Sequence, residues 1–172
     1  MRKTLYLMLG YPGAGKTTTA KIIHELTGAV HLWADEMRKE RFAKPTHSHK
    51  ENLELYGHLN EVADELLATG QSVVFDTNFN FYKDRDHLRN IAAKHGAKTY
   101  VIWVTTPLHI AKDRATNNVR YPYDDVFPTK RFDRISRNLQ LPREDEPHIT
   151  VDGTKVTKQY VEALLKKLEF SS

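Results

Sequence analysis

The feature that most constrains the fold of this chain is a glycine-rich stretch near its N-terminus, residues 10–17. It reads Gly-Tyr-Pro-Gly-Ala-Gly-Lys-Thr and matches the pattern G-x-x-x-x-G-K-[S/T] of a phosphate-binding loop. A short apolar run at residues 4–9 precedes it, and a segment of helical periodicity at residues 18–26 follows, closed by Gly28. Glycines let backbone N–H groups close around phosphate oxygens, and a helix N-terminus adds partial positive charge at the same place. Strand, glycine loop and helix in this order therefore predict a nucleotide-binding site.

Two side chains of this loop carry specific chemistry. Lys16 is expected to reach the β and γ phosphates of the nucleotide, and the hydroxyl of Thr17 is expected to ligate Mg²⁺. The alternative is a chance match, or a glycine turn that only connects a strand to a helix. The residues predicted to bind the nucleotide are Gly10, Pro12, Gly13, Ala14, Gly15, Lys16, Thr17 and Thr18.

Short apolar runs and helical patterns alternate along the chain. This alternation predicts an α/β fold of three layers, with a five-stranded, mainly parallel sheet and helices on both faces. The predicted strands are residues 4–9, 29–34, 72–76, 99–104 and 148–151. The predicted helices are residues 18–26, 36–41, 51–69, 84–95, a segment from Pro107 onward, 129–139 and 157–168. The predicted loops are residues 43–50, 117–128 and 142–147, the last a surface linker.

Composition and charge set further limits. Of the 172 residues, 40% are apolar and 28% charged, so we expect a single soluble domain over residues 1–172. No apolar run is long enough to cross a membrane, and the N-terminus lacks the cleavage region of a signal peptide. The sequence contains no cysteine, which excludes disulfides and thiolate metal sites and fits a cytoplasmic location. The net charge of +4 suits a protein that binds polyphosphates, but it is too small to indicate nucleic-acid binding by itself.

A carboxylate, Asp35, follows the second predicted strand, and Arg38 lies three residues later. This spacing places both side chains on one side of a helical turn. Ligands of parallel sheets bind at the C-terminal ends of the strands, so Asp35 is expected at the same edge as the phosphate loop. We expect Asp35 to orient and deprotonate an acceptor hydroxyl, with Arg38 holding the acceptor or the carboxylate. The alternative is a helix N-cap with a surface ion pair.

A second carboxylate, Asp76, closes the third predicted strand at the same edge. A hydrophobic run that ends in aspartate is the form that positions Mg²⁺ or its water ligands in phosphate-loop proteins. Thr77 and Asn78 follow in a predicted loop, where Asn78 is expected to contact the acceptor. Whether Asp76 contacts the metal or the acceptor stays open, and the alternative is a simple turn sequence.

Basic residues are frequent in the second half of the chain. Arg114 and Arg120 lie in a candidate lid around residues 112–128 and would stabilise the charge of a transferring phosphoryl group. The alternative is a solvated face. A second group recurs along the next predicted helix, where we favour a solvent-exposed face over a surface for a phosphate-bearing acceptor. This group consists of Lys130, Arg131, Arg134 and Arg137.

Histidines and tryptophans are interpreted structurally. His47 and His49 flank a serine, and alternating histidines could ligate a metal, but the sequence offers no third ligand and a polar loop explains them. Trp33 and Trp103 lie within predicted strands and are assigned to the core.

The motifs that are missing narrow the function further. Regulatory GTPases carry Asn-Lys-x-Asp and Asp-x-x-Gly, and neither string occurs in this sequence. A phosphate loop with an acidic residue and a candidate lid instead favours phosphoryl transfer to a hydroxyl acceptor. A nucleotide-binding regulatory protein with slow or no hydrolysis is the alternative. Nucleic acid bound through the basic residues at 130–137 is a third hypothesis.

The chain resembles the small P-loop kinases of the AAA_33 type over most of its length, in the order and spacing of residues 10–17, 35–38, 73–78, 114–120 and 142–146. These kinases include the kinase domain of polynucleotide kinases, and relatives of zeta-toxin and chloramphenicol phosphotransferase. The resemblance implies a kinase that uses ATP and Mg²⁺, with Asp35 as general base, Arg38 on the acceptor side and Asp76 nearby. The sequence Asp-Thr-Asn at 76–78 leans toward the polynucleotide branch. A polynucleotide 5′-OH is therefore the leading candidate acceptor, ahead of a small hydroxylated metabolite or antibiotic.

Overall fold

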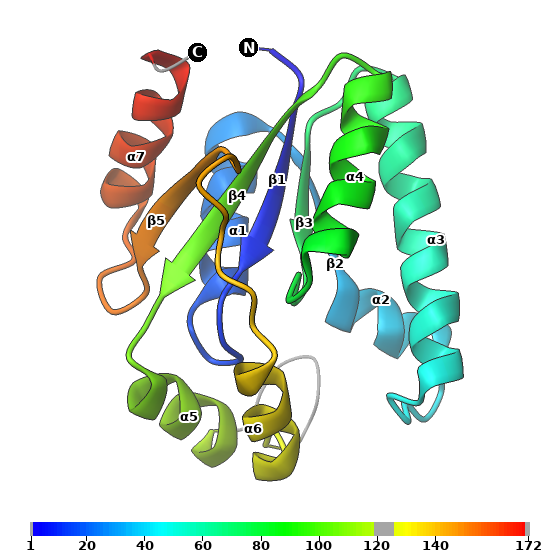
Figure 1. The fold of residues 1–172 in the computed structure, drawn as a ribbon, viewed down its shortest axis with the longest axis vertical. Helices are drawn as coiled ribbons and strands as arrows, with labels where there is room; N and C mark the ends of the chain where they lie inside the picture. Colours follow the sequence, from blue (N-terminus) through cyan, green and yellow to red (C-terminus); the bar gives the residue numbers. More distant parts are fainter. Residues whose placement is uncertain (1, 119–125, 171–172) are drawn as a thin grey trace.

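A parallel sheet forms the centre of the computed structural model, which describes residues 2–118 and 126–170. Its strands are β1 (Thr4–Leu9), β2 (Val30–Trp33), β3 (Val73–Asp76), β4 (Lys98–Thr105) and β5 (His148–Asp152). They lie in the order β2-β3-β1-β4-β5, and each pair of neighbours is parallel (Figure 1). The predicted α/β fold and its five strands are confirmed.

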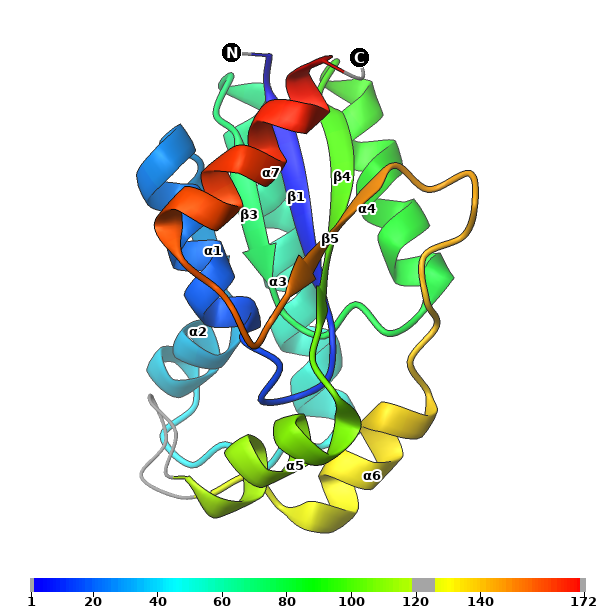
Figure 2. The same cartoon turned by 90° about the vertical axis from the view of Figure 1, so that its left-hand side faces the viewer.

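Helices cover both faces of this sheet. They are α1 (Lys16–Thr27), α2 (Ala34–Arg41), α3 (His49–Ala68), α4 (Tyr82–Lys94), α5 (Leu108–Asn117), α6 (Thr129–Arg137) and α7 (Lys158–Phe170). Helices α1 and α7 lie on one face and α3 and α4 on the other, whereas α5 and α6 lie beyond the C-terminal ends of the strands (Figures 1 and 2). No helix in the described part of the chain is long and apolar enough to span a bilayer.

The central strand β1 shows why the sheet forms at this place. All six of its side chains are buried. Leu5 and Leu7 belong to the apolar cluster formed with α3 and α4, whereas Tyr6 and Met8 belong to the cluster formed with α1 and α7. A parallel strand that is covered on both faces requires a continuous apolar run, and residues 4–9 supply it.

Helices α1 to α4 each begin earlier than the sequence patterns predict. Helix α2 begins at Ala34, so Asp35 lies in its first turn. Helix α3 begins at His49, inside the segment predicted as a loop, because the hydroxyl of Ser48 accepts a hydrogen bond from the backbone N–H of Glu51 at 3.2 Å. Ser-x-x-Glu is a helix-start signal, and the polar composition of residues 43–50 obscured it.

The linker at residues 142–147 contains a buried carboxylate, so the prediction of a surface segment is wrong at Glu146. This side chain accepts two hydrogen bonds from Arg85 of α4, at 2.9 and 2.8 Å, and Arg85 is completely buried. Arg85 also donates to the carbonyl oxygens of Phe79, at 2.8 Å, and Gln140, at 3.1 Å. It thereby joins α4 to the segment after α6 and to the loop after β3. A run of charged residues gives no sign that one of them has a partner 61 residues away.

Candidate active site

The phosphate loop lies between the end of β1 and the start of α1, as its pattern predicts. Gly13 adopts φ 78°, a left-handed conformation, and a Cβ at this position would collide with the carbonyl oxygen of Ala111 in α5. The hydroxyl of Thr106 donates to the carbonyl oxygen of Ala14 at 2.8 Å. The loop is therefore packed tightly against the segment that leads from β4 into α5.

The ammonium group of Lys16 folds back over this loop. It donates hydrogen bonds to the carbonyl oxygens of Gly10 and Tyr11, both at 2.9 Å. Lys16 is the first residue of α1, so its charge lies beside the helix N-terminus, where an anion is also favoured by the helix dipole.

A cavity of about 530 Å³ opens at the C-terminal edge of the sheet, above the phosphate loop. Seven elements and the segments between them contribute to its wall. Among the residues predicted to function, it is lined by Pro12, Gly13, Gly15, Lys16, Thr17, Thr18, Asp35, Arg38, Asp76, Asn78 and Arg114. Gly10 and Ala14 are buried in the loop behind it. Arg120 lies outside the described residues, as does most of the loop predicted at 117–128.

Asp35 and Arg38 lie in α2 and both face this cavity. Arg38 is only 3% exposed and forms a buried ion pair with Glu51 of α3, and its Nη2 donates to Asn52 at 2.7 Å. Its Nε has no hydrogen-bond partner in the described part of the chain. Nε is therefore a buried N–H donor of this guanidinium that the contacts above leave unused.

Glu51 was not recognised in the sequence, because nothing in its own segment indicates a partner on another helix. Burial alone would raise the pKa of Glu51, but hydrogen bonds from the backbone of Thr46, from Arg38 and from the Thr46 hydroxyl lower it to about 2. The carboxylate is therefore ionised at neutral pH, and it balances the charge of Arg38.

Asp76 lies at the end of β3, 3% exposed, and one of its carboxylate oxygens, Oδ2, contacts His31 Nε2 at 3.1 Å. The ring of Trp33 stacks on His31 with the centroids 5.9 Å apart, and the ammonium of Lys21 lies 5.0 Å from the centre of the Trp33 ring. Trp33 is buried as predicted, but it also lines the cavity. Trp103 is only half-buried, because it lies on β4 beside the edge strand β5.

Neutral hydrogen-bonding groups lie beside the two carboxylates. The hydroxyl of Tyr56 in α3 contacts the hydroxyl of Thr77 at 2.8 Å, and burial raises the pKa of Tyr56, which keeps the phenol protonated. The buried Oδ1 of Asn78 has no hydrogen-bond partner among the described residues. This side of the cavity can thus accept hydrogen bonds from an uncharged hydroxyl-bearing molecule and donate hydrogen bonds to it.

Arginines from α5 and α6 form the opposite wall. Arg114 donates from Nη1 to the carbonyl oxygen of Gly153 at 3.0 Å, which ties α5 to the turn after β5. Arg131 lies over the ring of Phe127, 4.8 Å from its centre, and lines the cavity. Lys130, Arg134 and Arg137 are exposed, as predicted for the whole group. The interpretation of Arg131 as part of a solvent-exposed face is therefore wrong, because α6 turns this one position toward the sheet edge.

Thr17 and Asp76 are among the oxygen donors of this cavity, and they could hold Mg²⁺. Mg²⁺ is commonly held by one or two protein oxygens, with substrate phosphates and water completing an octahedron, and a hydroxyl with a carboxylate fits that requirement. Within residues 2–118 and 126–170, no group of three or more His, Cys, Asp or Glu side chains is arranged to hold a metal ion. His49 lies in the first turn of α3, and His47 precedes it.

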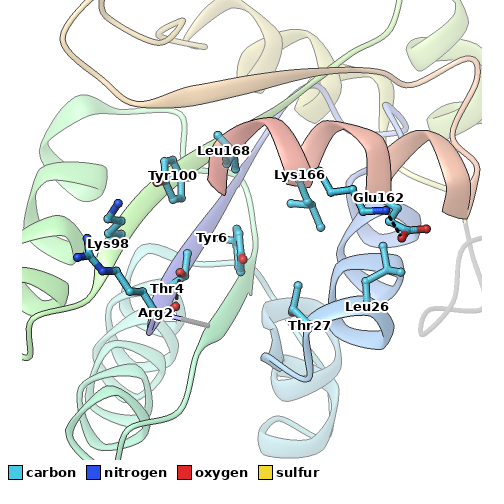
Figure 3. A pocket seen from close by; sticks show the side chains of 11 residues that line it. Arg2, Thr4, Tyr6, Leu26, Thr27, Lys98, Tyr100, Glu162, Lys166 and Leu168 are labelled. Atoms are coloured by element: carbon cyan, nitrogen blue, oxygen red, sulfur yellow. Dashed lines mark hydrogen bonds and ion pairs between the residues drawn. The ribbon is translucent and has the colours of Figure 1, made fainter. Parts of the chain in front are cut away.

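A second cavity, of about 490 Å³, lies at the opposite, N-terminal edge of the sheet (Figure 3). Side chains from the starts of β1 and β4 and from α1 and α7 line it, among them Tyr6 and Tyr100. Its carboxylate, Glu162, is paired with Lys166 at 2.8 Å. None of the residues predicted to function lines this cavity.

Comparisons with known proteins give the same picture of the fold. The sequence matches AAA_33, a family described as an AAA domain, over residues 5–142. A sugar kinase from Janibacter sp. HTCC2649 is similar in structure, with a TM-score of 0.72 at 19% identity over 98% of this chain and 95% of that chain. A gluconokinase from Sinorhizobium meliloti 1021 has a TM-score of 0.66 at 20% identity over 100% and 99%. The APS kinase of Mycobacterium tuberculosis, in complex with AMPPNP and APS, has a TM-score of 0.66 at 18% identity over 98% of both chains. No curated protein matches the sequence.

Proposed function

The chain belongs to the AAA_33 family of AAA domains, and from this premise we propose that it is a kinase that transfers the γ-phosphoryl group of ATP to a hydroxyl group. One observation carries the proposal: Asp35 faces the same cavity as Lys16 and Thr17. A carboxylate that can accept a proton thus lies opposite the groups that hold the phosphates. This is the arrangement that phosphoryl transfer to an alcohol requires.

The donor half of the site consists of the phosphate loop and Lys16. The loop amides and the ammonium group bind the β and γ phosphates, and Thr17 and Asp76 would hold Mg²⁺. When bound, the metal ion would supply positive charge to the phosphate oxygens. Arg114 stabilises the transferring group from the wall formed by α5 and α6. The same role is predicted for Arg120, which lies outside the described residues.

The acceptor half consists of Asp35, Arg38, Asp76 and Asn78. The acceptor oxygen attacks the γ-phosphorus while Asp35 takes the hydroxyl proton, and the bond from the γ-phosphorus to the β–γ bridging oxygen breaks to release ADP. The unpaired Nε of Arg38 and the Oδ1 of Asn78 are available to orient the acceptor. No covalent enzyme intermediate is needed, because donor and acceptor share one cavity.

A polynucleotide 5′-OH is the leading candidate acceptor, supported by the resemblance of Asp-Thr-Asn at residues 76–78 to the polynucleotide branch. The names of the solved neighbours point instead to small acceptors, since they include a sugar kinase, a gluconokinase and an APS kinase. A small hydroxylated metabolite or antibiotic is therefore the second candidate. The balanced charge of Arg38 and the neutral groups around Thr77 favour this second class.

The test uses ATP labelled at the γ-phosphate and a panel of 5′-OH oligonucleotides, nucleosides, sugars and hydroxylated antibiotics. We expect Mg²⁺-dependent transfer of label to one class, and chelation of Mg²⁺ by EDTA to stop it. ATP binding without label transfer to any member of the panel would instead support a regulatory nucleotide-binding protein. If oligonucleotides accept no label and show no salt-dependent binding, the nucleic-acid acceptor is wrong.

A further inference from the structure

We propose that His31 is a positioning residue that holds the Asp76 carboxylate in the orientation required for Mg²⁺. The proposal rests on the metal-binding role of Asp76 in the proposed function. It assigns a role to a strand residue that no sequence motif marks and that lies outside the cavity wall.

The contact between the two side chains joins neighbouring strands. His31 of β2 pairs in register with Val74 of β3, and Trp33 pairs with Asp76. Side chains two residues apart on a strand point to the same face, so His31 can reach along β2 to Asp76. The 3.1 Å contact engages Oδ2 of Asp76. Because a carboxylate can only accept a hydrogen bond, the ring must donate from Nε2.

A stack of side chains fixes the imidazole ring. Trp33 lies nearly parallel to His31, with 9° between the ring planes, and the ammonium of Lys21 lies over the Trp33 ring, 5.0 Å from its centre. Lys21 comes from α1, one turn after Thr17. A residue of α1, the helix that begins at the phosphate loop, therefore helps to fix the position of the His31 ring. The stack thereby connects the helix that carries Thr17 to the strand that carries Asp76, the two expected metal ligands.

This arrangement restricts the carboxylate of Asp76. An aspartate whose Oδ2 is held by a stacked, half-buried ring cannot rotate freely about its terminal bond, so its other oxygen keeps a constant direction. Groups that hold a metal ligand in this way commonly change metal affinity or activity by about 10- to 100-fold when they are removed. The same side-chain pair elsewhere in the chain, His95 with Asp64, joins two helices and lines no part of this cavity.

The decisive variants are His31→Phe, which keeps an aromatic ring against Trp33 but removes the N–H donor, and His31→Gln, which keeps a donor. His95→Gln is the matched control for loss of a histidine–aspartate pair. Binding of AMPPNP is measured by calorimetry in EDTA and over a range of Mg²⁺ concentrations, and thermal melting verifies that each variant is folded. No acceptor is needed for this measurement.

We expect His31→Phe to raise the Mg²⁺ concentration for half-maximal tightening of AMPPNP binding about 10- to 100-fold, with unchanged affinity in EDTA. His31→Gln should lie closer to the wild type, and His95→Gln should match it. If His31→Phe does not fold, His31→Leu takes its place as the variant without a donor. The proposal is then supported when His31→Leu raises the Mg²⁺ requirement and His31→Gln keeps that of the wild type. Unchanged Mg²⁺ dependence in folded His31→Phe or His31→Leu overturns the proposal.

A parallel variant, Asp76→Asn, separates this proposal from the one on which it rests. If Asp76→Asn shifts the Mg²⁺ requirement and His31→Phe does not, the role of His31 is wrong and that of Asp76 stands. If Asp76→Asn also leaves the requirement unchanged, Asp76 is not a metal ligand and both assignments fail. Transfer of labelled phosphate to the acceptor panel still tests kinase activity independently in either case.

Discussion

At the scale of single residues, pairing decides which charges are available in the cavity. Arg38 and Glu51 are both buried, and the negative charge of the carboxylate balances the positive charge of the guanidinium. Arg38 therefore contributes directed hydrogen-bond donors to the site more than net charge. Asp35 faces the same cavity from the first turn of α2. In the proposed function, this carboxylate removes the proton from an acceptor hydroxyl.

Replacement of Asp35 by asparagine tests this role directly. The change keeps the shape of the side chain but removes the base, so turnover should fall by about 10²–10⁴-fold while ATP binding stays nearly intact. Turnover of labelled ATP and calorimetric ATP affinity are the two measurements. Glu40→Gln, at an exposed position of the same helix, is the control and should leave both values unchanged. An Asp35→Asn enzyme of wild-type rate would falsify the base assignment.

The low pKa of Glu51 predicts a dependence of stability on pH. The folded value is about 2, below the ordinary value of 4.5, so the carboxylate stabilises the fold above about pH 4.5 and loses this contribution as the pH falls toward 2. Glu51→Gln should therefore lose less stability than the wild type between pH 7 and pH 3. Urea unfolding at the two pH values measures the difference, and equal losses in the two proteins would contradict the assignment.

At the scale of elements, the buried pair of Arg85 and Glu146 joins parts of the fold that lie far apart in the chain. Through Phe79 and Gln140, Arg85 also fixes the loop that carries Asn78 and the segment that follows α6. The loop after β3 reaches the cavity through Thr77 and Asn78. The acceptor side of the site therefore depends on a charge pair that itself touches no ligand.

Arg85→Met should destabilise the protein by about 3–5 kcal/mol, because it leaves the buried carboxylate of Glu146 without its main partner. The free energy of unfolding in urea measures this loss. Arg41→Met is the control, since the Arg41–Glu54 pair is 40% and 47% exposed and such pairs contribute about 0–1 kcal/mol. A similar, small loss in both variants would show that the Arg85 pair does not stabilise the fold.

At the scale of the whole molecule, the cavity is assembled from helices and strands on both sides of the sheet. The phosphate loop, α2, α3, the end of β3, α5 and the region of α6 all contribute to its wall. A ligand that contacts several of these elements at once binds the folded state and not the unfolded chain. Nucleotide binding should therefore stabilise the whole molecule.

Mg²⁺ and AMPPNP at about 100 times the dissociation constant should raise the free energy of unfolding by about 2.7 kcal/mol. Urea unfolding with and without the nucleotide measures this gain, with MgCl₂ alone as the control. Lys16→Ala should reduce the gain at the same nucleotide concentration, because it removes the ammonium group from the phosphate loop. No gain in the wild type would mean that the loop does not bind the nucleotide.

Local patterns were sufficient for much of this structure. The phosphate loop, the five strands and the expectation that Asp35 and Asp76 lie at one sheet edge follow from short stretches of sequence and from the geometry of parallel sheets. The start of α3 also has a local signal in the sequence, the pair Ser48 and Glu51. The catalytic and metal-binding roles of the side chains remain predictions.

Contacts between distant segments decided the rest. The sequence alone determined the α/β alternation and the phosphate loop, because hydrophobic periodicity and glycine conformation act over a few residues. Only the tertiary structure decided that Glu51 balances Arg38, that Glu146 is buried against Arg85, that Arg131 turns inward and that His31 meets Asp76. A charged or polar side chain has the same local sequence signature whether it faces water or a partner. Its environment is set by which elements the sheet order brings together, and that order is a property of the packed molecule.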